Sequence, residues 1–479
     1  MYRFILQNLR SQMTRWLIWI TTDIVVLILI LIIYGCTSHE NPFDPKNEQT
    51  KGRPFNLSES AGFGEIKLTW KHPMLDGKPM PIDFYRIYKK GTKGVWSLLA
   101  DISKDSSCFT DSSVVSDIQY YYKLQAVRGN DASDFSQIGP VSTYWFPDSL
   151  EEIELTTTEP IAIAFSPSYR QDRYIADSWN NTVYILNSDD KYIDKCEVGK
   201  KPEALIVWNE ENIDYIFVCN WGDRTVSLHR RELNYGMCSE LSKINIGSRP
   251  EAVVAISIDT IFVAATDDSL HKIIVVDQDF LVKDTAIAIT PDDHSLLYLP
   301  DSNKIIVISD NANEIFLIES KSLTIEPMTV DGLNKAADCA ISSDGKWLYI
   351  ANYGGPEHVL IIDIGSRTLV GSIILPEIYE QYKAISVAFV PVPECPLGDL
   401  LFILGINNSG VASIFSYIIR VQNNIPEATF LKIKEIDNND VIKAYQIRYT
   451  LSDDERRLYI LLHNHIQSSG AFKLIEPIN

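Results

Sequence analysis

Four oxygen-bearing side chains stand at the same place in a repeated pattern of the sequence. Asp177, Asn220, Asp310 and Asn352 each end a short run of strand-forming residues. Carboxylate and amide oxygens brought together could hold a hard cation such as Ca²⁺. The same residue types favour tight turns, because their side chains accept hydrogen bonds from nearby backbone groups. They would end the second strand of each unit, one strand away from a central channel. We therefore interpret them as turn residues and predict no metal site.

Other patterns that could support catalysis are sparse. His463 and His465 would lie on one face of a strand, but no third ligand is close to them in the sequence. The sequence contains no Gly-x-Ser-x-Gly elbow, no Gly-rich phosphate loop and no His-Glu-x-x-His motif. We predict no catalytic residue and no cofactor, and we expect a binding function.

The four turn residues belong to an apolar phrase that returns seven times. Its copies begin at Tyr174, Phe217, Phe262, Val307, Tyr349, Phe402 and Tyr459, so successive starts lie 43, 45, 45, 42, 53 and 57 residues apart. This spacing is about the length of one four-stranded blade in a radial β architecture. A single four-stranded sheet cannot bury both of its faces, so neighbouring sheets must cover them. The repeat therefore predicts an all-β protein whose sheets form a ring.

The two ends of the repeat complement each other. The last unit supplies three strands, at 444–451, 458–462 and 471–476, whereas the segment before the first innermost strand has no unit of its own. Pairing the two would satisfy two open sheet edges. We predict that residues 153–157 pair with residues 471–476 and close the ring.

The repeat resembles the YVTN family of β-propellers, which is related in shape to lactonase-like and NHL propellers. The likeness rests on Tyr349-Ile-Ala-Asn352, on Ser343-Asp-Gly345 before it, and on the junctions Gly199-Lys-Lys-Pro202 and Gly247-Ser-Arg-Pro250. It extends over residues 150–476 and implies a seven-bladed β-propeller at 146–479. It also implies an alternative function, a metal-dependent lactonase or hydrolase with its site at the channel mouth. No catalytic residue of such enzymes carries over to a position in this sequence.

Residues 51–145 show short alternating runs separated by turn residues, as in a β-sandwich. Ile66-Lys-Leu-Thr-Trp70, Phe84-Tyr-Arg-Ile-Tyr-Lys89 and the run from Tyr120 to Val127 follow one another in the order of a fibronectin type III domain, which this segment resembles. The resemblance implies a β-sandwich that serves as a spacer, with a tyrosine corner at Tyr120.

The N-terminal residues 1–35 have the layout of a secretory signal, with basic residues, an apolar stretch and a small residue before Cys36. Ile33-Tyr34-Gly35-Cys36 resembles a bacterial lipobox, which implies lipidation of Cys36 and a tether at 36–50. The alternative is an uncleaved anchor, because about 19 apolar residues also span a bilayer. Either interpretation predicts export. Thr37 after the cysteine points to the outer membrane or cell surface, because an acidic residue there favours retention in the inner membrane.

Six cysteines follow Cys36, which is enough for disulfides in an exported chain. Cys219 and Cys339 fall inside apolar strands, where a free thiol packs as a small hydrophobe. The sequence contains no Cys-x-x-Cys pair. We expect most of the six to be free core thiols.

The chain of 479 residues has a formal net charge of −20 and a pI near 4.8. Nucleic-acid binding needs clustered Lys and Arg that displace counterions, so we expect no nucleic-acid partner.

Two sets of loops should lie on one face of the ring, the turn between strands two and three and the link to the next unit. Exposed aromatic and charged residues on such a face are typical of recognition surfaces. The candidate binding residues are Trp179, Trp221, Tyr353, Arg249 and His358, with Asn180, Lys200, Lys201, Glu203 and Glu251 near them. The alternative is that the aromatic rings pack over the sheet edges.

Together these observations predict a non-catalytic lipoprotein, exported and anchored to the bacterial cell envelope by an N-terminal lipid. Its propeller would bind an envelope protein or glycan.

Overall fold

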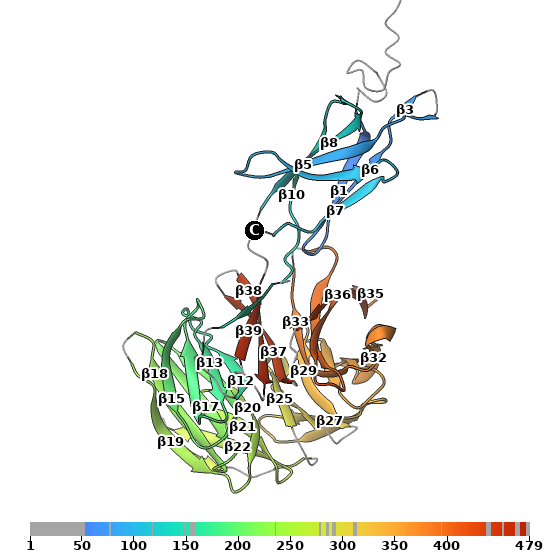
Figure 1. Cartoon of the computed structure of the whole chain (residues 1–479). Helices are drawn as coiled ribbons and strands as arrows, with labels where there is room; N and C mark the ends of the chain where they lie inside the picture. Colours follow the sequence, from blue (N-terminus) through green and yellow to red (C-terminus); the bar gives the residue numbers. More distant parts are fainter. Residues whose placement is uncertain are drawn as a thin grey trace, which may run out of the picture. The chain divides into compact units, whose positions relative to one another are not determined.

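The structure is a computed structural model that describes residues 53–475, except 76–77, 117, 148, 154, 156–158, 235, 277–278, 284–286, 290–293, 310–313, 394, 437–441, 453–454 and 465–469. The chain divides into two compact units, one ending at Tyr144 and the other beginning at Trp145 (Figure 1). The signal, Cys36 and the tether lie outside the described residues. Within the described ranges, no helix has both the length and the apolar character needed to cross a membrane.

Within the described residues, the first unit contains two larger antiparallel sheets and one two-stranded sheet. The first sheet has the strand order β1 (Phe55–Ala61), β2 (Ile66–Lys71), β7 (Cys108–Asp111). The second has the order β10 (Ser136–Val141), β8 (Tyr120–Arg128), β5 (Phe84–Gly91), β6 (Ser97–Ser103), and β9 (Asp131–Ala132) pairs with β8. A short ladder joins β3 (Met74–Leu75) to β4 (Lys78–Pro79).

One core fills the space between these two sheets. Alternate residues of β2, such as Leu68 and Trp70, are buried with Tyr85 of β5 and Tyr122 of β8. This alternation is what a strand with one buried face requires. The backbone N–H of Val115 donates a hydrogen bond of 3.1 Å to the hydroxyl of Tyr120. Tyr120 therefore bonds the backbone a few residues upstream, as a tyrosine corner does.

The second unit contains seven sheets of at least four strands within the described residues. Six of them are formed from consecutive strands, and we number them 1 to 6. Sheets 1 to 3 contain β12 (Pro160–Phe165), β13 (Arg173–Asp177), β14 (Thr182–Leu186), β15 (Tyr192–Glu197); β16 (Pro202–Glu210), β17 (Ile213–Asn220), β18 (Thr225–Glu232), β19 (Ser239–Asn245); and β20 (Pro250–Ser257), β21 (Thr260–Ala265), β22 (Ser269–Val276), β23 (Asp279–Lys283), with β24 (Ile287–Ala288) on β22.

Sheets 4 to 6 contain β25 (His294–Leu299), β26 (Lys304–Ser309), β27 (Glu314–Glu319), β28 (Ile325–Thr329); β29 (Ala336–Ile341), β30 (Trp347–Asn352), β31 (Val359–Asp363), β32 (Thr368–Ile373); and β33 (Lys383–Val390), β34 (Asp399–Ile406), β35 (Ala412–Gln422), β36 (Ile425–Glu435). Sheet 7 has the order β11 (Ser149–Glu152), β39 (Gly470–Ile475), β38 (Glu455–Asn464), β37 (Ile442–Ser452). Two short 3₁₀ helices, η1 (Pro300–Ser302) and η2 (Glu377–Tyr379), lie in connections.

The repeated phrase forms the second strand of each sheet, which is buried on both faces. In β17, Tyr215, Phe217 and Cys219 pack against sheet 3, whereas Ile216 and Val218 pack against sheet 1. A strand covered on both sides needs a continuous apolar run rather than an alternating one. The phrase therefore marks the strand that fills the space between neighbouring sheets.

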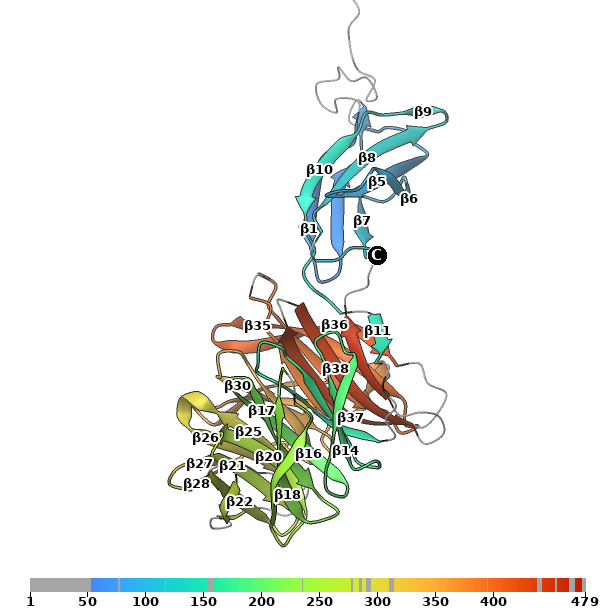
Figure 2. The ribbon, with the colours of Figure 1, turned by 90° about the vertical axis from the view of Figure 1, so that its left-hand side faces the viewer.

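The sheets form a closed series. The first strand of each sheet contacts the first strand of the next, and β12 also contacts β37. In both views the labelled first strands β20, β25 and β37 lie near one another (Figures 1 and 2). The predicted ring is therefore present.

Sheet 7 joins the two ends of the second unit, but not through the predicted residues. The segment that pairs with β39 is β11, with Leu150 opposite Leu474 and Glu152 opposite Phe472. The prediction of residues 153–157 was wrong, because the side chain of Ile153 is buried between sheets 1 and 7 with Ile163 and Tyr459. The predicted partner strand at 471–476 was correct to within one residue.

A buried polar network also joins sheets 1 and 7. The hydroxyl of Tyr459 accepts a hydrogen bond of 2.8 Å from Arg173 Nε and donates one of 2.8 Å to Asp190. Arg173 and Asp190 also form an ion pair at 3.3 Å, and Arg457 lies 3.4 Å from the same carboxylate. Buried charges are tolerated only when they are paired in this way.

Deleting residues 149–152 should lower the cooperative melting temperature of the second unit, because β39 loses the strand that pairs with it and becomes an open sheet edge. Differential scanning calorimetry of the deletion variant measures this. An unchanged melting curve would show that β11 does not hold the ring closed.

Tyr459→Phe should destabilise the protein by about 1–3 kcal/mol, because it leaves two buried charged groups with one hydrogen bond fewer each. Tyr349→Phe is the matched control, since Tyr349 holds the same place in its phrase and its buried hydroxyl has no hydrogen-bond partner among the described residues. Denaturant unfolding of both variants gives the comparison. Equal losses of stability would contradict a role for the network.

Candidate binding site at the channel mouth

The first strands of the seven sheets surround a cavity of about 860 Å³. Each of these strands contributes lining residues, among them Ala162 of β12, Ala204 of β16 and Ala252 of β20. Small side chains suit this position because the strands converge there. The lining also includes residues just beyond the strand ends, such as Trp221 and Tyr353, so the cavity opens on the face that holds those loops.

The same backbone hydrogen bond recurs at this mouth in four sheets. The residue after the second strand donates its N–H to the carbonyl of the residue directly before the first strand. The bonds run from Ser178 to Glu159, from Trp221 to Lys201, from Thr266 to Arg249 and from Tyr353 to Lys335, at 2.9–3.0 Å. The chain direction thus places equivalent residues of different sheets at equivalent points around the opening.

Glycine permits this geometry at two junctions. A side chain on Gly199 would place its Cβ 2.5 Å from Cγ of Asn220, which is closer than atoms can approach. Gly247 has a φ of +85°, a left-handed conformation that other residues rarely adopt. The Gly-x-x-Pro motifs therefore set the path of the chain into the first strand.

Most of these equivalent positions carry a cation. They hold Lys201, Arg249 and Lys335, and the register of β33 places Lys383 at the same point in sheet 6. All four residues are exposed. We call Lys201, Arg249, Lys335 and Lys383 the cationic rim. It stands out on a chain with a net charge of −20.

Cations of the rim cover the aromatic rings of the mouth. The guanidinium of Arg249 lies 3.9 Å from the centroid of Trp221, and Lys201 Nζ lies 5.5 Å from it. Lys383 Nζ lies 4.7 Å from the centroid of Tyr353. Such contacts orient a cation against the negative face of a ring. In two places a cation of one sheet therefore rests on an aromatic residue of the sheet before it.

Carboxylates lie further inside the channel. Glu203 and Glu251 follow the rim positions by two residues and line the cavity. Deeper, Asp338 of β29 pairs with Arg448 of β37 at 2.6 Å and accepts a hydrogen bond from Ser386 of β33. The mouth thus has a positive rim above a wall of mixed charge.

The candidate residues from the sequence fall into three groups. Trp221 and Tyr353 line the mouth, and Arg249 lies over the ring of Trp221. Trp179 is 72% exposed and follows β13, but it is not among the residues that line the cavity.

His358 is the third case and requires a correction. It is buried, and its Nδ1 accepts a hydrogen bond of 3.2 Å from the backbone N–H of Leu375. Burial lowers the pKa of this imidazole. It lies in the turn between β30 and β31, but its burial leaves the ring unavailable to a ligand.

The predicted turn residues do hold turns. Asp177 Oδ1 accepts hydrogen bonds from the backbone N–H groups of Glu159, Trp179 and Asn180. Asn352 Oδ1 accepts one of 2.7 Å from the N–H of Asn334. The turn interpretation is confirmed for both residues, and Asp310 lies outside the described residues.

The sequence analysis did not identify two rim residues, Lys335 and Lys383. Their junctions lack the Gly-x-x-Pro motif, since Ala336 and Ala384 replace the proline. The repeated phrase could have located them. The last residue of each phrase pairs with one residue of the first strand, and the rim residue comes directly before that partner.

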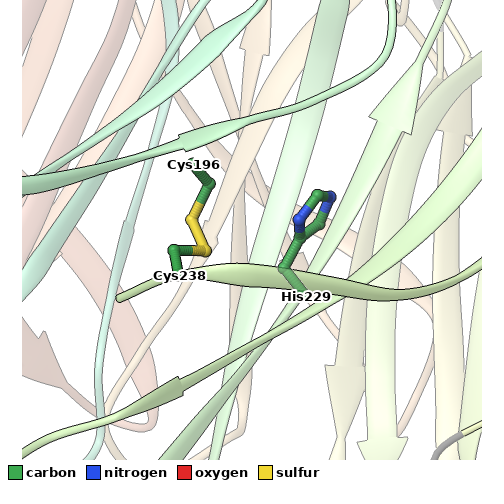
Figure 3. Close-up of side chains that lie close together, drawn as sticks. All are labelled: Cys196, His229 and Cys238. Carbon is green, nitrogen blue, oxygen red and sulfur yellow. A yellow bond between two sulfur atoms is a disulfide. The ribbon is translucent and has the colours of Figure 1, made fainter. Parts of the chain in front are cut away.

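A second chemically distinctive group lies at the outer strands. Cys196 of β15 and Cys238, immediately before β19, form a disulfide with a Cα–Cα distance of 5.2 Å, and His229 of β18 lies beside them (Figure 3). Burial lowers the pKa of His229 to about 4, so the imidazole is neutral near pH 7. Of all the residues that the structure describes, these three form the one group of His, Cys, Asp and Glu side chains that could hold an ion. The alternative hydrolase function would place its metal at the channel mouth, and this group lies away from that mouth.

The expectation for the cysteines holds for most of the six, but it missed one disulfide. Of the six cysteines, all within the described residues, Cys196 and Cys238 form the disulfide, so most of the six lie outside it. Cys108 is exposed rather than in the core. The pairing of Cys196 with Cys238 was not predicted, because 42 residues separate them and only the packing of two sheets brings them together.

No protein-family model matches the sequence, and no curated protein matches it. Among solved structures, the β-propeller domain of Cps50 (Swd1) from Myceliophteria thermophila is similar, with a TM-score of 0.51 and 9% identity over 68% of this chain and 100% of that chain. Virginiamycin B lyase from Staphylococcus aureus aligns with a TM-score of 0.47 and 15% identity, over 68% of this chain and 99% of that chain.

The likeness to the Swd1 domain shows the fold: the chain contains a β-propeller. At 9% identity it shows nothing beyond the fold. The site must be interpreted from its own residues.

Replacing Cys196 and Cys238 together by Ser should lower the free energy of unfolding by about 4 kcal/mol, the loop-closure value for a 42-residue separation. Guanidinium unfolding without a reductant measures this. Cys219→Ser, which removes a buried free thiol, is the control for loss of packing. Equal effects in the two variants would exclude a cross-link between sheets 1 and 2.

Proposed function

We propose that this protein is a non-catalytic lipoprotein of the bacterial cell envelope whose seven-bladed propeller binds an anionic protein or glycan at the channel mouth. The fibronectin type III domain is the spacer, and Cys36 carries the lipid. The observation that carries the binding function is the cationic rim, because its four residues hold equivalent positions in different sheets, and two of them, Lys201 and Lys335, line the cavity.

Charge and shape support an anionic ligand group. Exposed cations around a concave site attract carboxylates and steer their approach. The rings of Trp221 and Tyr353 hold three of these cations in place, which reduces the side-chain freedom lost on binding. An aromatic residue beside Arg is also a common centre of a protein interface.

The N-terminal sequence supports the location. A secretory signal that ends in a lipobox-like motif anchors the mature protein by its first residue. A tether and a spacer would then hold the propeller away from the membrane surface, where a polymer or an envelope protein is within reach.

Lys335→Ala combined with Lys383→Ala should weaken binding of polyanions at least about tenfold, which corresponds to 1.4 kcal/mol. The measurement is biolayer interferometry on the full chain in nonionic detergent, with polygalacturonate as the acidic glycan and poly-L-glutamate as the acidic polypeptide. Neutral dextran is the negative ligand. The polymer that binds more tightly identifies the class of partner.

Lys191→Ala combined with Lys321→Ala is the matched control. These exposed lysines lie in turns between third and fourth strands, at the opposite end of their sheets. If neither polymer binds at low salt, or if both double variants bind equally weakly, the rim is not the site.

A further inference from the structure

We propose that Cys196, Cys238 and His229 bind one Zn²⁺ ion when the disulfide is reduced, so that sheets 1 and 2 stay cross-linked in either redox state. This site is separate from the channel mouth and does not depend on the function proposed there.

The three side chains already meet. One ligand atom from each lies within 4.8 Å of the others, and the three come from or next to three different strands, β15, β18 and β19. Figure 3 shows the His229 ring next to the disulfide, with one ring nitrogen on the side of the sulfur atoms. In a tetrahedral zinc site with Zn–S bonds near 2.3 Å, two thiolate sulfurs lie about 3.8 Å apart. Once the S–S bond is broken, rotation of the cysteine side chains supplies that separation.

The surroundings of His229 suit a metal ligand. Its Nε2 lies 2.9 Å from Oγ of Ser227, which also accepts a hydrogen bond of 3.0 Å from Asn220 Nδ2. When Nε2–H donates to Ser227, Nδ1 keeps its lone pair for the metal. Zinc-binding histidines are usually oriented by such a second hydrogen bond.

Burial and ligand type select the ion. Cys196 and His229 are each 1% exposed, whereas Cys238 is half-buried. Two thiolates and an imidazole favour Zn²⁺ over Ca²⁺ and Mg²⁺, which take oxygen ligands. The open side at Cys238 leaves room for water as the fourth ligand.

The chemical step balances in two stages. A dithiol reductant gives two electrons and two protons to the Cys196–Cys238 bond, which breaks to two thiols, while the reductant becomes a disulfide. Zn²⁺ then replaces the two thiol protons, which pass to solvent. A newly made chain carries its thiols reduced, so the site is available before the disulfide forms.

The experiment uses the full chain in detergent, reduced by a phosphine and kept without oxygen. Co²⁺ alone is the spectroscopic probe, and it should give a sulfur-to-cobalt charge-transfer band that one equivalent of Zn²⁺ removes. The oxidised chain should give no band. His229→Ala should weaken Co²⁺ binding at least about tenfold, as loss of a ligand or of its orienting partner does.

His271→Ala is the matched control, because His271 is also a buried histidine bonded to a serine two residues before it, at 2.7 Å, but has no thiols beside it in the described part of sheet 3. It should bind Co²⁺ like the unaltered chain. Equal weakening in the two variants would overturn the proposal.

Thiol alkylation tests the site without any substitution. Zn²⁺ should protect Cys196 and Cys238 of the reduced chain from iodoacetamide, with the exposed Cys108 as the unprotected internal reference. Circular dichroism confirms that the reduced chain is folded. Unchanged alkylation of both cysteines in the presence of Zn²⁺ would rule out the site.

Discussion

The whole second unit depends on one constraint: a four-stranded sheet has two apolar faces and can cover neither alone. Core clusters are shared between sheets 1 and 2, 2 and 3, 3 and 4, 4 and 5, 5 and 6, and 7 and 1. No sheet in such a series has a core of its own. Stability therefore requires that the series closes. The pairing of β11 with β39 and the Arg173–Tyr459–Asp190 network both lie where the two ends of the second unit meet.

The binding site follows from the same constraint. Because the first strands converge, they surround a channel, and because every sheet has the same chain direction, equivalent residues return at equivalent points around its mouth. The Lys or Arg at such a point in four sheets becomes a set of cations around one ring once the ring forms. A short repeat in the sequence is thus converted into a site that no single unit contains. In sheet 1 the equivalent position holds Glu159 instead of a cation.

Links between neighbouring sheets are of different kinds. Apolar burial holds most of the interfaces, ion pairs join sheets 1 and 7, and Asp338 with Ser386 and Arg448 joins sheets 5, 6 and 7 near the channel. Two links join sheets 1 and 2. One is the buried ion pair of Arg231 with Asp172, at 2.6 Å, and the other is the disulfide between Cys196 and Cys238. The added covalent link places a redox-sensitive group where two units meet.

The sequence by itself determined the strand class, the positions of the repeated strands, the turn roles of Asp177 and Asn352, and the strand with which the ring closes. These features depend on local patterns, since apolar runs and turn residues act within a few positions of each other. Only the tertiary structure decided the burial of His358, the pairing of Cys196 with Cys238, the register of β11, and the equivalent positions of Lys335, Lys383, Lys201 and Arg249 around one ring. Each of these depends on how separate sheets lie against one another, and residues far apart in a chain carry no local signal of their contact.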